Sequence, residues 1–403
     1  MELKKYKLGE IAYFVEDKIS SDDVSLSEYI TTDCLLQNKK GRTIAQNLPP
    51  KPCSLTKFKK GDVLIGNIRP YLKKIWFADI NGGCSPDVLA LRAKNEKESS
   101  YLYSLLLQDD FYDFVMKAAK GSKMPRGDKK HILTFPCFDI KNKTKIGDLL
   151  SKIDQKIALN RRINTKLETI AKRLYDYWFV QFDFPDANGN PYKSSGCKMV
   201  WNDALKREIP EGWEVGNICM IADILSGGTP SKANARYWEN GTLPFFGPTD
   251  YNGNVFQIET SEYITEDGLK HCASSLFEEG VIIITARGSI GKLIIVGTPM
   301  AMNQSCYALR SKTGEYEYLY FLTTQLIDCL KAKGSGSVFK SINTLDIENS
   351  LLCVADAKTI SKFCSMVKPL LNKIKESIKE TARLTALRDK LLPLLMNGQV
   401  EVA

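Results

Sequence analysis

Apolar side chains in two long segments of this chain follow the alternating spacing of four and three residues that is typical of paired helices. In residues 141–182 the pattern places a seam at Ile146, Leu150, Ile153, Ile157, Asn160, Asn164, Leu167, Ala171, Leu174 and Trp178. Shifted by 217 positions, it places a second seam in residues 356–403 at Phe363, Val367, Leu370, Ile374, Ser377, Thr381, Leu384, Arg388, Leu391 and Leu395. Both seams are apolar at their ends and polar at their centres. We therefore expect two long helices that pair antiparallel, with the polar centre setting their alignment. The alternative is two unrelated amphipathic helices, each packed on its own domain.

Prolines interrupt the second pattern. Pro369 removes a helical hydrogen bond and disfavours the helical conformation of Lys368, so it predicts a kink or a new start there. Pro393 has the same effect on the last turn, and Gly398 lies where a glycine commonly ends a helix.

The rest of the chain has the pattern of two α/β domains, residues 1–140 and 213–355, joined by a linker at residues 183–212 that is rich in turn formers. We expect strands at Asp62–Ile65 and Ile75–Phe77, a turn at Asn81–Gly83 and a helix over residues 100–120. In the second domain we expect strands at Val281–Ile284 and Leu293–Val296, and a helix from Tyr316 to Lys333.

These two domains repeat each other. The run Gly61–Ile75 matches Gly280–Ile294, and Tyr101-Leu-Tyr103 matches Tyr318-Leu-Tyr320, at offsets of 219 and 217 residues. A near-constant offset indicates a tandem duplication. The predicted fold class is α+β, with two similar globular α/β domains separated by two long helices that pair as an antiparallel coiled coil, giving pseudo-two-fold symmetry.

Charge is concentrated on the helical segments. The chain has 403 residues and a net charge of +9, and residues 141–180 hold ten Lys/Arg against four Asp/Glu. Residues 357–396 hold nine against three. The excess fits either two solvated helix faces or a basic surface that faces a polyanion or an acidic partner subunit.

The apolar runs, cysteines and histidines of the chain bear on its cellular location and on metal binding. No apolar run reaches the roughly 18 residues of a membrane span, and no apolar stretch follows the first residues as a secretory signal would require. The eleven cysteines are scattered singly and there are two histidines, which favours reduced thiols in a cytoplasmic protein without a zinc site.

Catalytic motifs are missing. The nearest approach to a P-loop, Gly288–Leu293, lacks the spacing and the hydroxyl, and Asn47-Leu-Pro-Pro-Lys51 does not match an amino-methyltransferase loop. We expect a non-catalytic chain that holds no cofactor or metal of its own.

Loops that follow the strand-like runs carry the candidate binding residues. Arginine and lysine on such loops can pair with guanine or neutralise phosphate, and the alternative is ordinary turns with solubilising charges. In the first domain the candidates are Lys39, Lys40, Arg42, Arg69, Tyr71, Lys73, Lys74, Lys123 and Arg126. In the second they are Thr229, Ser231, Lys232, Thr249, Asp250, Arg287, Gly288, Ser289, Lys292, Ser337 and Lys340. Because the two sets of side chains differ, we expect the two domains to recognise different short base sequences.

Several runs give the chain a family resemblance. They are Leu174–Pro185, Met199-Val-Trp201, Ile209–Val215, Gly227–Ser231, Arg287–Gly291 and Leu387–Leu395. In these runs, and in the order domain, helix, domain, helix, the chain resembles the specificity subunits of type I restriction–modification systems.

The resemblance implies two target-recognition domains, each binding one half of a bipartite, asymmetric site in double-stranded DNA, with the helices fixing the spacer. It also implies partners: two methyltransferase (modification) subunits that use S-adenosylmethionine and dock on the helices, and restriction/translocase subunits that use ATP with Mg. The alternative function is a stand-alone duplicated scaffold that binds protein partners and not DNA.

Overall fold

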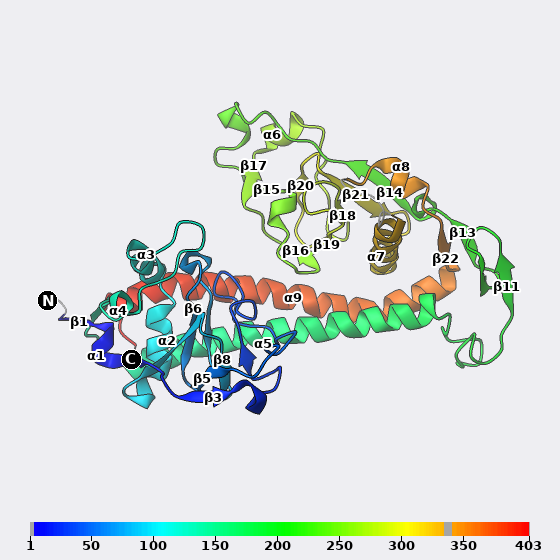
Figure 1. The fold of residues 1–403 in the computed structure, drawn as a ribbon. Coiled ribbons are helices and arrows are strands. Elements are labelled where there is room, and N and C mark those ends of the chain that lie inside the picture. The colour runs from blue at the N-terminus through cyan, green and yellow to red at the C-terminus, as the bar shows by residue number, and fades with distance from the viewer. Residues whose placement is uncertain (1–3, 334–340, 403) are drawn as a thin grey trace. The chain divides into compact units, whose positions relative to one another are not determined.

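The computed structural model describes residues 4–333 and 341–402 (Figure 1). The chain divides into two compact units, residues 1–159 with 381–403 and residues 160–380. Each unit holds one globular α/β domain and part of each of two long helices, α5 (Lys143–Tyr175) and α9 (Ala357–Met396). The predicted domain bounds, which treat each helix as a segment of its own, stay predictions.

The domain of the first unit is built on two four-stranded sheets. One has the order β2 (Ala12–Phe14), β9 (Val88–Ala93), β6 (Val63–Gly66) and β7 (Ile75–Phe77), all antiparallel. The other has the order β3 (Lys18–Ser20), β5 (Ser54–Phe58), β8 (Gly82–Cys84) and β4 (Tyr29–Ile30). A third pairing joins β1 (Lys5–Lys7) to β10 (Pro136–Phe138). Helices α1 (Leu8–Ile11), α2 (Ser99–Leu106), α3 (Asp109–Lys117) and α4 (Lys129–Ile132) complete the domain.

Two local predictions for this domain are wrong. The helix expected over residues 100–120 is split into α2 and α3, because Gln108 is extended (φ −65°, ψ 145°) and Asp109 and Asp110 begin a new helix, where acidic side chains are favoured. The turn expected at Asn81–Gly83 is instead strand β8. A Cβ at Gly82 would lie 2.2 Å from the Glu28 carbonyl oxygen, so this glycine permits a close backbone approach inside the sheet.

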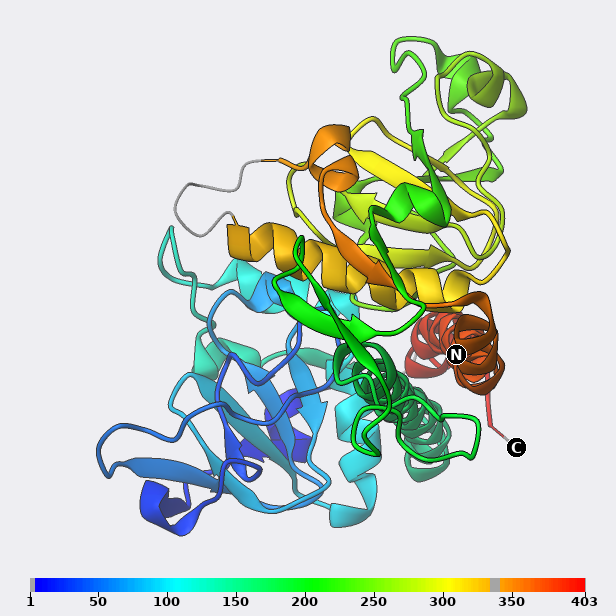
Figure 2. The same cartoon turned by 90° about the vertical axis from the view of Figure 1, so that its right-hand side faces the viewer.

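The domain of the second unit repeats this plan. Its main sheet has the order β14 (Ala222–Ser226), β21 (Cys306–Ser311), β18 (Ile282–Thr285), β19 (Leu293–Val296) and β16 (Phe256–Gln257). A smaller sheet contains β17 (Glu262–Ile264), β15 (Leu243–Phe246) and β20 (Ala301–Met302), and β13 (Glu214–Gly216) pairs with β22 (Leu352–Val354). Helix α7 (Tyr316–Lys333) contacts β18, β19 and β21 of the main sheet (Figure 2). The short helices are α6 (Glu266–Lys270) and α8 (Thr344–Glu348). Within residues 183–212 the chain forms a hairpin of β11 (Met199–Asn202) and β12 (Arg207–Pro210).

Matching hydrogen bonds show that the internal repeat is structural. In the first domain the Gly66 amide donates to the Lys74 carbonyl over 3.0 Å, and in the second the Thr285 amide donates to the Lys292 carbonyl over the same distance. Gly61 to Ala78 (2.8 Å) and Gly280 to Val296 (3.0 Å) form a second matched pair. The loops between these strands therefore have the same anchors in both domains.

The two long helices run antiparallel within each unit. In the first unit, Ile146 and Leu150 of α5 share a core with Leu392 and Leu395 of α9. In the second, the Asn160 amide group donates to the Glu380 carboxylate over 2.8 Å, and fifteen residues further along α5 Tyr175 lies 5.9 Å from Phe363 between ring centroids.

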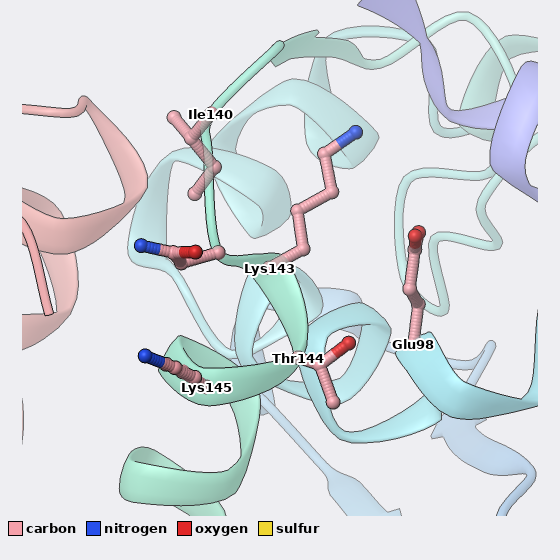
Figure 3. A pocket seen from close by; sticks show the side chains of 6 residues that line it. Glu98, Ile140, Lys143, Thr144 and Lys145 are labelled. Carbon is pink, nitrogen blue, oxygen red and sulfur yellow. The ribbon is translucent and has the colours of Figure 1, made fainter. Parts of the chain in front are cut away.

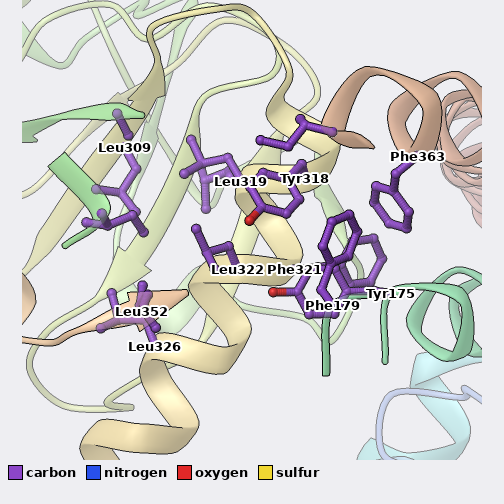
Figure 4. Packing of buried hydrophobic residues seen from close by; sticks show 14 of the residues in the cluster. Tyr175, Phe179, Leu309, Tyr318, Leu319, Phe321, Leu322, Leu326, Leu352 and Phe363 are labelled. Atoms are coloured by element: carbon purple, nitrogen blue, oxygen red, sulfur yellow. The ribbon is translucent and has the colours of Figure 1, made fainter. Parts of the chain in front are cut away.

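Aromatic packing joins the helices to the second domain. Phe179, just past the end of α5, lies 5.0 Å from Phe363 and 4.9 Å from Tyr318 between ring centroids (Figure 4). The cluster continues through Leu319 and Leu322 of α7 to Leu309 of β21, and all three are fully buried. The pairing of the helices is therefore part of the domain core.

Every predicted seam residue of α5 and α9 is buried or half-buried. In α9 the neighbours Leu371 and Leu392 are more deeply buried than the predicted Leu370 and Leu391. The new start expected at Pro369 does not occur, because α9 is continuous from 357 to 396. The burial of Val367 and Leu371 on either side of the proline offsets its lost hydrogen bond.

Candidate nucleic-acid interface

Three predicted loops of the first domain meet. The Asn38 and Lys39 amides donate to the Leu72 and Lys73 carbonyls, each over 2.9 Å, which attaches loop 37–42 to loop 67–74. On its other side, the Arg69 amide donates to the Pro125 carbonyl over 2.8 Å. Loops that are far apart in sequence thus form one surface, and Tyr71 at its centre is 50% exposed.

Acidic residues neutralise part of the positive charge on this surface. Lys39 and Lys73 both pair with Asp109 at the start of α3, at 2.8 and 2.7 Å. Burial alone would raise the pKa of Asp109, but the two ammonium groups hold that pKa below its usual value. Arg126 is exposed and pairs with Asp87 over 2.9 Å. Arg126, whose side chain is 59% exposed, can exchange Asp87 for phosphate at small cost, because exposed ion pairs are weak. The Lys39 and Lys73 side chains are less accessible, at 11% and 30% exposed.

Three further cations of this set, Lys40, Lys74 and Lys123, differ in their surroundings. Lys40 and Lys123 are exposed. The Lys74 ammonium group donates to the Thr32 carbonyl oxygen. This contact ties the base of loop 67–74 to the segment that precedes loop 37–42.

Arg42 is committed to the interior of the domain. Its guanidinium lies 4.4 Å from the centroid of the Trp76 ring and donates to the Ser27 carbonyl over 2.9 Å. The side chain is 16% exposed, and burial lowers its pKa. Arg42 therefore supports the domain structurally, which its position in a basic run could not have indicated, and its contact with DNA stays a prediction.

In the second domain, residues 302–305 join three predicted loops. The Gly228 amide donates to the Met302 carbonyl over 3.1 Å, and the Asn303 amide donates to the Phe246 carbonyl over 3.0 Å. The Ala286 amide donates to the Ser305 carbonyl over 2.8 Å. Loops 227–232, 247–252 and 286–292 are thereby brought together.

The candidates on these loops fall into two groups. Arg287, Gly288, Ser289, Lys292, Thr249 and Ser231 are exposed. Thr229 donates to the Gln304 side chain, and Lys232 pairs with Glu262 while lying 3.5 Å from the Trp238 ring centroid. Asp250 accepts from the Gly247 amide (2.8 Å) and from the amide and hydroxyl of Ser261 (2.8 and 2.6 Å). Asp250 is therefore a structural acceptor, and its contact with DNA stays a prediction. Ser337 and Lys340 lie outside the described residues.

Sequence reasoning missed the connecting segments themselves. Residues 303–305 correspond to residues 85–87 in the first domain, where the Asn67 amide donates to the Asp87 carbonyl over 2.9 Å. Both segments directly precede the central strands β9 and β21. The constant offset could have identified them, but neither is basic or glycine-rich, and so neither matched the criteria for a reading loop.

A cavity of about 390 Å³ lies at the start of α5 (Figure 3). It is lined by Glu98, Ile140, Asn142, Lys143, Thr144 and Lys145. The Lys143 ammonium pairs with Asp139 over 3.0 Å, within 4.8 Å of the Tyr6 ring centroid. The cavity therefore offers one further exposed cation, Lys145, and the open end of a helix.

The described residues contain neither a metal site nor a membrane-spanning helix. No group of three His, Cys, Asp or Glu side chains in residues 4–333 and 341–402 is placed to hold a metal ion. Over the same part of the chain, no helix has the length and apolar content needed to span a membrane.

The long helices present basic and apolar side chains to solvent. The exposed cations are Lys145, Lys152, Lys156, Arg162, Lys166, Lys172 and Arg173 on α5, and Lys358, Lys362, Lys368, Lys373, Arg383 and Lys390 on α9. Among the apolar residues of α5, Leu149, Leu159 and Ile170 are 37–53% exposed. Apolar side chains among cations are what a binding face needs, although a solvated face remains the alternative.

Comparison with known proteins shows which proteins this chain is similar to. The family model for the type I restriction modification DNA specificity domain matches residues 210–380. The MjaIX type I restriction enzyme specificity subunit of Methanocaldococcus jannaschii is 28% identical, over 100% of this chain and 89% of that protein. Along its whole length the chain is therefore similar to type I restriction–modification specificity subunits, and residues 210–380 match the specificity domain itself.

Further type I specificity subunits are similar to this chain along its full length. The HindI specificity subunit of Haemophilus influenzae is 24% identical over 98% of this chain and 99% of that protein. The crystal structure of a type I restriction–modification S subunit from M. genitalium is 16% identical and covers 100% of this chain and 97% of that chain, with a TM-score of 0.59. This likeness confirms the predicted α+β fold class.

Proposed function

We propose that this chain is the DNA sequence-specificity subunit of a type I restriction–modification complex, in which each globular domain binds one half of a bipartite, asymmetric DNA site. The proposal rests on one observation: the two domains have the same backbone hydrogen bonds around a matching loop, but different side chains on that loop. The loop between β6 and β7 and the loop between β18 and β19 have matching anchors, yet one presents Asn67, Arg69 and Tyr71 and the other Ala286, Arg287 and Gly288. A shared frame with unlike side chains suits two different base sequences.

The long helices would set the spacer and dock two methyltransferase subunits. α5 has 33 residues and is therefore about 50 Å long, compared with roughly 34 Å for one turn of duplex DNA. Its exposed cations and leucines support a docking face. The chain itself would be non-catalytic. S-adenosylmethionine would belong to the modification subunits, and ATP with Mg to the restriction/translocase subunits.

A domain exchange tests this proposal. Residues 1–140 are replaced by the corresponding domain of the HindI relative, and sequences bound by the full chain are selected from a random duplex library. The expected result is a change in one half-site and retention of the other. A change in both half-sites would contradict independent reading.

The second candidate is a duplicated scaffold that binds protein partners and not DNA. The neutralisation of Lys39 and Lys73 by Asp109 is the observation that favours it. Phosphate contacts make affinity fall steeply with salt. Duplex binding that is absent, or unchanged between low and high salt, would favour the scaffold.

A further inference from the structure

The loop at residues 67–74 of the first domain is held in an unfavourable backbone conformation. Arg69 and Lys73 adopt φ values of +52° and +50°, on either side of a turn at Pro70–Leu72. Non-glycine residues rarely occupy this region, and they persist there only where the surroundings enforce it. Here the enforcement comes from backbone hydrogen bonds to loop 37–42 and to Pro125.

The same loop contains two buried polar atoms without a hydrogen-bond partner in the described part of the chain, Asn67 Oδ1 and Arg69 Nε. A buried donor or acceptor that gave up water without gaining a partner costs free energy. Such atoms are rare in folded proteins and call for an explanation. Asn67 and Arg69 are two residues apart, so strain and unsatisfied groups coincide in one short segment.

The fold does not require either feature. In the second domain Ala286 stands in place of Asn67, and the positive φ of its loop is taken by Gly288 (φ +76°). The anchoring bonds to the following strand and to the connecting segment are nevertheless the same. The free-energy cost of the positive φ values and of the unsatisfied buried atoms therefore arises from the side chains of the first domain. The shared fold does not require it.

We propose that Asn67 and Arg69 are the base-reading residues of the first domain. This inference rests on the proposed function. Asparagine pairs with adenine through N6 and N7, and arginine with guanine through O6 and N7, in the major groove. On contact with duplex DNA the two side chains turn outward, and Asn67 Oδ1 and Arg69 Nε gain the partners that they lack. The target bases thus supply the hydrogen bonds that these two atoms of the loop lack in the free protein.

Two conservative variants test the assignment. Arg69→Lys keeps the positive charge but removes Nε and the planar fork, and Asn67→Ala installs the residue found at the matching place in the second domain. Each variant of the full chain is used to select from a random duplex library, and its melting temperature is measured. We expect each to relax the preference at one base position of one half-site by at least about fivefold, with the other half-site unchanged.

The melting temperatures should be equal to or higher than that of the wild type, because each substitution removes an unsatisfied buried atom. Arg310→Lys, an exposed arginine at the end of β21 remote from residues 303–305, is the matched control and should change neither property. Unchanged base preference, or a variant that unfolds, would overturn the assignment while leaving the proposed function intact. A wild-type chain that selects no sequence would instead overturn the proposed function.

Discussion

The Arg388 guanidinium of α9 donates to the Asp154 carboxylate of α5 over 2.7 Å. Arg388 is 5% exposed and also donates to Asp389. Burial alone would lower the pKa of Arg388, but the two carboxylates raise it above its usual value. Arg388 occupies a seam position that an apolar residue would fill in a simple coiled coil, so this pair links the two helices through charge.

Breaking this pair should be costly. Arg388→Ala leaves Asp154 buried and uncompensated, which typically costs about 3–5 kcal/mol. The free energy of unfolding in urea should fall by that amount. Asp154→Leu combined with Arg388→Met should restore stability to within about 1–2 kcal/mol of the wild type or exceed it. A single substitution that costs less than the double one would show that the pair is not coupled.

Gly147 allows α5 to lie directly against α2. A Cβ at this position would be 2.3 Å from the Tyr101 amide nitrogen. Gly147→Ala should therefore destabilise the protein by about 1–3 kcal/mol through overpacking, although alanine is the better helix former by about 1 kcal/mol. Ala158→Gly, at an exposed position of the same helix, measures the propensity effect alone. A Gly147→Ala variant that is more stable than the wild type would contradict the close approach.

Glu168 on α5 is half-buried near Tyr251 and Tyr320. Burial raises its pKa from 4.5 to about 7. The folded state binds this proton more tightly than the unfolded state. The contribution of Glu168 to the free energy of unfolding is therefore most favourable at low pH and falls as pH rises from about 4.5 to 7.

Glu168→Gln should therefore raise the melting temperature at pH 8 and have little effect at pH 5. The measurement is thermal unfolding followed at both pH values. Glu376→Gln, an exposed change on α9, should alter neither. An equal effect of Glu168→Gln at both pH values would contradict a buried carboxyl.

Arg287 is an exposed cation on the loop between β18 and β19. Arg287→Ala should weaken duplex binding through the second half-site only, and should reduce the slope of log affinity against log salt by about 1 if it contacts phosphate. Fluorescence anisotropy over a salt series measures both. Arg310→Ala is the control, and unchanged affinity would remove Arg287 from the contacts.

The regular helices and strands could be predicted because their apolar residues recur at the spacing typical of each element. β7, β19 and α7 have the predicted bounds, and the predicted seam residues of the two long helices are buried or half-buried. The continuity of α9 through Pro369 could not be predicted, because packing on either side of the proline outweighs its local preference. The break at Gln108 was missed because the apolar pattern continues across it, although Asp109 and Asp110 are typical of a new helix start. At the interface, loops 67–74 and 286–292 were located by duplication and charge, whereas the roles of Arg42 and Asp250 depend on partners distant in sequence.

The most direct test of two independent readers on one frame is the methylome of cells that produce this chain with its modification subunit. Single-molecule sequencing of modified adenine should give a split motif of two unlike half-sites separated by an unspecified spacer of constant length. A continuous palindromic motif would contradict the account.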